Sequence, residues 1–105
     1  MEKWVFVPKY VKERMAEVKD KTGRSLNQQA GFYIAHILES SGLNVSSIPL
    51  MDEEEAVHLY EIDMEKVEEI QRRGAGLSAA GAIRLALIHG VNTNEMLLKE
   101  EDENS

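Results

Sequence analysis

The feature that most constrains the fold of this 105-residue chain is a repeated order of predicted elements. Residues 3–42 contain a short strand pattern followed by two helical patterns, and the same order returns after residue 56. One strand with two short helices cannot cover its own apolar face. The sequence therefore predicts that the two units pair their strands into an antiparallel ribbon and close four helices around a shared core, within one chain or across a dimer.

The first unit is defined by periodicity and by residues that begin or end helices. "KWVFV" at residues 3–7 predicts a strand, and Pro8 suits the first position of a helix. Gly23 ends this helix, Ser25 caps the next one, and Gly42 stops it. The apolar stripes that we expect to face the core are Val11, Met15 and Val18 on the first helix, and Leu26, Ala30, Ile34, Ile37 and Leu38 on the second.

The second unit follows the same order with little sequence identity. "VHLYEI" at residues 57–62 predicts a strand, and Asp63 is a suitable N-cap for a shorter helix. Ser78 can cap the next helix, which Gly90 is expected to end. The best local agreement between the units aligns Gly23-Arg24-Ser25-Leu26 with Gly76-Leu77-Ser78-Ala79. The apolar stripes of this unit are Met64, Val67 and Ile70, then Ala79, Ile83 and Leu87.

These patterns predict an α+β fold that is mostly α. A capping box of Asn92 with Glu95 predicts a last short helix that carries Met96 and Leu97. The predicted divisions are a first unit at residues 1–43, a linker at 44–56, a second unit at 57–91, and a short helix with an acidic tail at 92–105.

Charge is distributed unevenly along the chain. Residues 1–50 hold seven Lys/Arg and five acids, a net charge of +2, whereas residues 51–105 hold five and fourteen, a net charge of −9. Much of the excess lies in acidic runs at residues 52–55 and 100–103, which are typical of solvated linkers and tails. The total of −7 opposes binding to nucleic acid.

Composition also limits the class of protein. The chain has no cysteine, no apolar run long enough to span a membrane, and no basic-then-apolar signal at its start. These observations favour a cytoplasmic protein without a membrane partner. His36, His58 and His89 are not at metal-ligand spacing, and no nucleophile–base motif is present. We therefore expect neither an enzyme nor a protein with a metal or another cofactor.

Two short motifs carry a family resemblance. "WVFVP" at residues 4–8 is followed after fourteen residues by "GRSLN" at 23–27, which resembles the Arc and Mnt branch of the ribbon-helix-helix family. "GLS" at 76–78 before "AIRLAL" at 82–87 is similar to the looser CopG-like form. Two such units in one chain resemble tandem members of the family, such as conjugation proteins of the TraY type and some archaeal viral regulators.

The resemblance implies a transcriptional regulator or repressor of plasmid, phage or archaeal-virus type that binds double-stranded DNA. In this family the ribbon enters the major groove, its outward side chains read bases, and the N-terminus of each second helix holds a phosphate. At Ser25 the same residues would also cap a helix, and the two roles can coexist. The residues that the resemblance implies for DNA binding are Lys3, Trp4, Phe6, Arg24, Ser25, Leu26, Asn27, His58, Tyr60 and Ser78.

The ribbon's outward face has two alternative registers. Counting back from Pro8 turns Glu2, Trp4 and Phe6 outward, and a slip by one residue would instead turn Lys3, Val5 and Val7 outward. In the second strand the alternatives are His58 and Tyr60, or Val57, Leu59 and Glu61. Neither register of the first strand gives the polar face that usually reads bases, and in the second strand His58 and Tyr60 are the better readers. An alternative function is therefore a protein-binding module of the same fold, antitoxin-like or an inhibitor, or a surface that binds a second copy.

Overall fold

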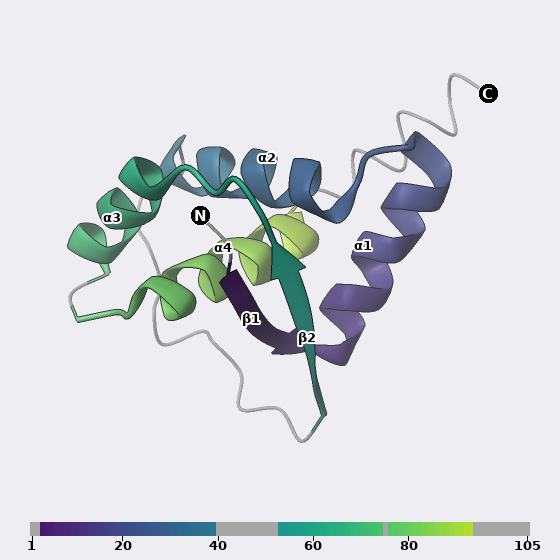
Figure 1. Cartoon of the computed structure of the whole chain (residues 1–105), viewed down its shortest axis with the longest axis horizontal. Coiled ribbons are helices and arrows are strands. Elements are labelled where there is room, and N and C mark those ends of the chain that lie inside the picture. The colour runs from purple at the N-terminus through teal and green to yellow at the C-terminus, as the bar shows by residue number, and fades with distance from the viewer. Residues whose placement is uncertain (1–2, 40–52, 75, 94–105) are drawn as a thin grey trace.

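The computed structural model describes residues 3–39, 53–74 and 76–93, which form a mixed α+β protein that is mostly helical, as predicted (Figure 1). Strand–helix–helix order occurs twice along the chain. The elements are β1 (Lys3–Pro8), α1 (Lys9–Thr22), α2 (Leu26–Glu39), β2 (Glu54–Leu59), α3 (Met64–Arg73) and α4 (Ala79–Thr93).

The two strands form an antiparallel ribbon, which confirms the predicted pairing. Val5 lies opposite Val57, and the paired residues run from Lys3 opposite Leu59 to Pro8 opposite Glu54. Val5, Val7, Val57 and Leu59 are all buried, so one face of the ribbon packs on the core. This alternation selects the register in which Trp4 and Phe6 point outward. In Figure 1 the ribbon lies in front of α4, with α2 and α1 beside it.

Strand β2 begins earlier than the sequence indicated. We predicted residues 57–62, whereas the strand is Glu54–Leu59 and takes in three residues that we had assigned to the linker. Because Val5 pairs with Val57, the end of β1 can only be paired by residues that precede Val57. After Leu59 the chain leaves the ribbon, and Glu61 has a φ of +52°, which is incompatible with a continuing strand.

Ion pairs stabilise the acidic start of β2. Carboxylate oxygens of Glu53, Glu54 and Glu55 lie 3.7, 2.7 and 3.5 Å from nitrogens of Lys9, Arg84 and Lys12, respectively. The Lys12 ammonium also donates a hydrogen bond of 3.0 Å to the carbonyl of Ala56. This part of the acidic run is therefore paired with α1 and α4, not a purely solvated linker.

The end of α1 and the start of α3 follow their sequence signals closely. Gly23, with a φ of +77°, ends α1 and donates its N–H to the carbonyl of Lys19, as predicted for a left-handed C-cap. Asp63 caps α3 by accepting hydrogen bonds from the N–H groups of Glu65 and Lys66. Pro8 differs slightly from the prediction, because it precedes the first residue of α1 and has an extended backbone.

Gly90 was predicted to end a helix, and this prediction is wrong. Helix α4 continues through Gly90 to Thr93. A Cβ on Gly90 would lie 2.3 Å from Cγ of Tyr33, so glycine is needed for the close approach of α2 and α4. Asn92, predicted to begin another helix, lies within α4. Gly42, Glu95 and the rest of the predicted short helix and acidic tail lie outside the described residues.

The core confirms most of the predicted apolar stripes. Leu26, Leu38, Met64 and Ala79 are partly buried at its margin, and the other predicted stripe residues are buried. Helix α4 is buried on more sides than one stripe predicts, because it packs against β1, α1, α2 and α3. Its additional buried residues are Ala82, Leu85, Ala86, Ile88, Gly90 and Val91.

Two histidines, His36 and His89, lie near each other between α2 and α4. The ring centroids of His36 and His89 are 5.9 Å apart. Burial, and then the charge of His36, lower the pKa of His89 below 6.5. In the unfolded chain His89 therefore binds a proton near pH 6.5, whereas in the folded chain it binds that proton only at lower pH. This group's contribution to stability is complete above that pH and is lost as pH falls through the folded pKa.

We expect the melting temperature of wild type to fall between about pH 7 and about pH 5, and His89→Gln to reduce this fall. Thermal melts followed by circular dichroism over this range check the prediction. Identical pH slopes for the two proteins would contradict it, because the variant has lost only the titrating group.

Candidate nucleic-acid interface

The outer side of the ribbon is an exposed aromatic surface. Trp4 and Phe6 are 60% and 57% exposed, and they lie opposite His58 and Ala56, which are half-buried. Tyr60 follows the end of β2 and is 51% exposed. We refer to Trp4, Phe6, His58 and Tyr60 as the aromatic face. Alternation along two paired strands produces it, because the buried inward positions are occupied by valine and leucine, namely Val5, Val7, Val57 and Leu59.

Three of these rings support one another. The rings of Trp4 and His58 are stacked across the strands, with centroids 4.2 Å apart and planes at 4°. His58 meets Tyr60 edge-to-face, with centroids 4.5 Å apart and planes at 65°. Such contacts favour this arrangement of the three rings. The aromatic face therefore presents packed rings that can contact a flat or apolar ligand group.

Ser25 caps helix α2, as predicted. Its hydroxyl accepts the N–H of Gln28 at 3.1 Å, and the Gln28 side-chain oxygen accepts the N–H of Ser25 at 2.8 Å. This is a capping box, which the spacing of Ser25 and Gln28 could have revealed in the sequence. The N–H groups of Leu26 and Asn27 still have no acceptor within the helix, because they lie in its first turn. They are available to an anion in addition to the cap.

Helix α4 begins in the same way. The Ser78 hydroxyl accepts the N–H of Gly81 at 3.0 Å, which confirms this cap. Each capping serine comes two residues after a glycine with positive φ, Gly23 at +77° and Gly76 at +89°. The predicted local match between the two units therefore extends to their backbone conformation.

Asn27 joins the start of α2 to the aromatic face. The backbone N–H of Tyr60 donates a hydrogen bond to Oδ1 of Asn27. Asn27 therefore holds two candidate regions together, and this oxygen is already engaged. Leu26 packs against the core, so its backbone is better placed than its side chain to meet a ligand.

Of the ten predicted site residues, four form the aromatic face, and Asn27 connects it to the cap at Ser25. Arg24 is exposed immediately before this cap. Lys3 is half-buried in the inward row of β1, opposite Leu59, and is not part of the aromatic face. Ser78 lies at the start of α4, where its hydroxyl accepts the N–H of Gly81. Glu2 lies outside the described residues.

Sequence reasoning missed Gln29, which holds the α1–α2 turn in place. Its side chain is buried, and Nε2 donates hydrogen bonds to the carbonyls of Met15 at 2.8 Å and Arg24 at 3.1 Å. The Tyr33 hydroxyl donates to its Oε1 at 3.4 Å. Gln29 therefore positions Arg24 and the start of α2. No sequence signal distinguishes it from a solvent-facing glutamine.

Arg84 was also missed, and it ties α4 to both strands of the ribbon. Its Nη1 donates to the carbonyl of Phe6 at 3.1 Å and lies 2.7 Å from Oε1 of Glu54. The side chain is only 18% exposed, so this ion pair is better shielded than a surface pair. It supports Phe6 from behind the aromatic face. Its role depends on residues distant in sequence, and no local motif identifies it.

The net charge of the described residues is close to zero. Residues 3–39, 53–74 and 76–93 contain 11 Lys/Arg and 12 Asp/Glu, a net charge of −1, whereas the whole chain is −7. Most of the negative charge thus belongs to residues outside this part. The objection to nucleic-acid binding that the total charge raised is weaker for the described fold.

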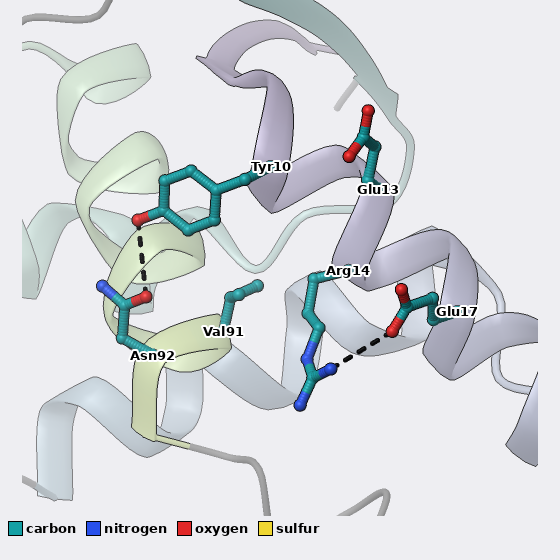
Figure 2. A pocket seen from close by; sticks show the side chains of 6 residues that line it. All are labelled: Tyr10, Glu13, Arg14, Glu17, Val91 and Asn92. Carbon is teal, nitrogen blue, oxygen red and sulfur yellow. Dashed lines mark hydrogen bonds and ion pairs between the residues drawn. The ribbon is translucent and has the colours of Figure 1, made fainter.

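A separate hollow lies between α1 and the end of α4 (Figure 2). The Tyr10 hydroxyl points from α1 to Asn92 Oδ1 at 3.4 Å, and Arg14 pairs with Glu17 at 3.1 Å. Glu13 and Val91 complete the lining. Because several of its polar groups bind one another and the ion pair is solvent-exposed, we do not assign a ligand to this hollow.

Comparison of the chain with models of known families, with curated proteins and with solved structures gave no match. In the described part, no group of three or more His, Cys, Asp or Glu side chains is arranged to hold a metal ion. Among the helices described above, none combines the length and apolar character needed to cross a membrane.

Proposed function

We propose that this protein is a DNA-binding regulator of the ribbon-helix-helix type, which inserts the β1–β2 ribbon into the major groove. The observation that carries the proposal is the two-stranded antiparallel ribbon, with one face packed on the core and Trp4 and Phe6 exposed on the other. The major groove admits a two-stranded ribbon. The repeated strand–helix–helix order and the motifs at residues 4–8 and 23–27 support the same assignment.

The start of α2 would hold a phosphate beside the ribbon. The hydrogen bond between Tyr60 and Asn27 brings this helix start next to the aromatic face. First-turn N–H groups and the positive end of the helix dipole favour an anion there, and Arg24 adds a full charge. In the second unit Leu77 occupies the position that corresponds to Arg24. The phosphate contact at α4 should therefore be weaker.

A salt titration tests this proposal. Wild type should bind random-sequence duplex DNA at low salt, because phosphate contacts need no particular sequence. Arg24→Ala should weaken binding and reduce the slope of log affinity against log salt by about one. Fluorescence anisotropy of a labelled duplex measures both quantities.

Arg72→Ala is the matched control. Arg72 is an exposed arginine in the last turn of α3 and pairs with Glu69, so it carries the same charge at a different place. Its removal should leave the salt slope unchanged. Equal slopes for wild type and Arg24→Ala would remove the phosphate role from α2. Absence of duplex binding by wild type at low salt would overturn the proposed function.

A second candidate function is protein binding through the aromatic face. Trp4, Phe6 and Tyr60 are exposed large side chains on one surface, and such residues are enriched at the centres of protein interfaces. This candidate function predicts no binding to duplex DNA. It also predicts a change in the fluorescence of Trp4, the chain's only tryptophan, when a partner protein or a second copy of the chain binds. Sedimentation of the purified protein over a range of concentrations would test the second copy.

A further inference from the structure

We propose that the aromatic face selects DNA sites by apolar contact with the C5-methyl groups of pyrimidines in the major groove. This inference rests on the proposed DNA binding and specifies which chemical group the ribbon reads. It starts from the side chains that the register turns outward, which are Trp4 and Phe6 on β1 and Ala56 and His58 on β2.

The outward positions lack the side chains that usually read bases. Direct readout relies on Arg, Lys, Asn and Gln, which form paired hydrogen bonds with base edges. The outward positions are Trp4, Phe6, Ala56 and His58, and none of them is one of these four residue types. The Nε2 atom of His58 is buried, so this ring nitrogen is not presented to a base edge. Sequence discrimination by several paired hydrogen bonds is therefore not available to this surface.

An apolar surface in the groove favours the apolar groups that it meets there. Covering a base-edge donor or acceptor without supplying a partner is unfavourable, because the group loses its hydrogen bond to water. The C5-methyl group of thymine is the apolar feature of the major groove, and phenylalanine and alanine are suitable contacts for it. Pairing of Phe6 with Ala56 supplies both types of side chain at one level of the ribbon.

The spacing of the aromatic residues suits neighbouring base pairs. Trp4 and Phe6 lie on either side of the buried Val5–Val57 pair. Alternate residues of a strand are roughly 6.6 Å apart. This spacing is about two steps of the DNA helix, which rises roughly 3.4 Å per step. One ribbon can therefore contact methyl groups that are two base pairs apart.

Two matched pairs of duplexes test the inference without knowledge of a natural site. Alternating A·T is compared with alternating A·U, and alternating G·C with the same duplex that carries 5-methylcytosine. Within each pair the hydrogen-bonding edges are the same and only the methyl group differs. Wild type should bind the methylated member of both pairs more tightly, by roughly fourfold for each methyl group contacted.

Variants place the effect on the ribbon. Phe6→Asn should reduce the preference within each pair by roughly the fourfold that its own methyl contact supplies. Phe32→Asn is the control, since Phe32 is a comparably exposed aromatic on α2 that stacks on His36, and it should keep the wild-type preference. Circular dichroism melts show whether each variant is folded, and Trp4 fluorescence reports contact at the aromatic face.

The outcomes separate the two proposals. Equal binding of methylated and unmethylated duplexes by wild type would overturn the methyl readout and leave DNA binding intact. Binding to none of the duplexes would overturn the proposed function, and the readout with it. Tighter binding to the single strands than to any duplex would also overturn the methyl readout, in favour of base stacking on the exposed rings. If Phe32→Asn also lost the preference for methylated duplexes, the methyl readout could not be assigned to the ribbon.

Discussion

Gly90→Ala is expected to destabilise the protein strongly, although alanine is the better helix former. The new methyl group would lie 2.3–2.7 Å from three atoms of Tyr33, and one of these is its Cβ, which cannot move away without the backbone. Helices α2 and α4 must then separate or Tyr33 must leave its buried position. Overpacking of this kind costs about 1–3 kcal/mol or more, out of a total stability of roughly 5–15 kcal/mol.

Gly31→Ala is the matched control, because Gly31 is also within a helix and nothing lies within 4 Å of a Cβ added there. This change should stabilise the protein by about 0.5–1 kcal/mol. Urea unfolding of the two variants therefore should give shifts of opposite sign. Shifts of the same sign would mean that α2 and α4 do not approach each other at Gly90.

Ile34→Asp should leave the chain largely unfolded at room temperature. Ile34 is buried in α2 and belongs to the stripe that faces the core. The substitution removes buried apolar area and places a carboxyl group among the buried side chains of the core, at a cost of several kcal/mol. Far-ultraviolet circular dichroism and a thermal melt measure the loss.

Phe32→Asp provides the comparison on the same helix. Phe32 is exposed, so its replacement removes little buried area and leaves the carboxylate in water. This variant should retain a cooperative melt near that of wild type. Equal damage from the two substitutions would contradict the assignment of buried and exposed sides to α2.

The sequence could predict much of the fold because several elements carry local signals. Gly23 and Asp63 act within one helical turn, so their roles are visible without tertiary structure. Strict alternation along β1 left two registers open. Only the pairing of Val5 with Val57 over the core decides between them. The predicted aromatic residues thus reached the surface in the register obtained by counting back from Pro8.

The remaining features depend on contacts between residues far apart in the chain. Gly90 looks like a helix stop locally, and its role appears only when Tyr33 packs against it. Glu54 looks like part of a solvated run until Arg84 pairs with it. Gln29 is similar, since its partners are carbonyls of the preceding helix and turn. Periodicity describes the sides of a helix but does not show how many neighbours surround it.

The ribbon is formed by two different strands of one chain, and this gives it a direction. Trp4 lies opposite His58 at one end of the central valine pair, and Phe6 lies opposite Ala56 at the other. A ribbon made from two identical chains has a two-fold axis and matches a palindrome. Here the two ends differ, so a DNA site bound in the proposed manner need not be palindromic. A bound molecule would then point one way along the duplex, and neighbouring copies could be ordered head to tail.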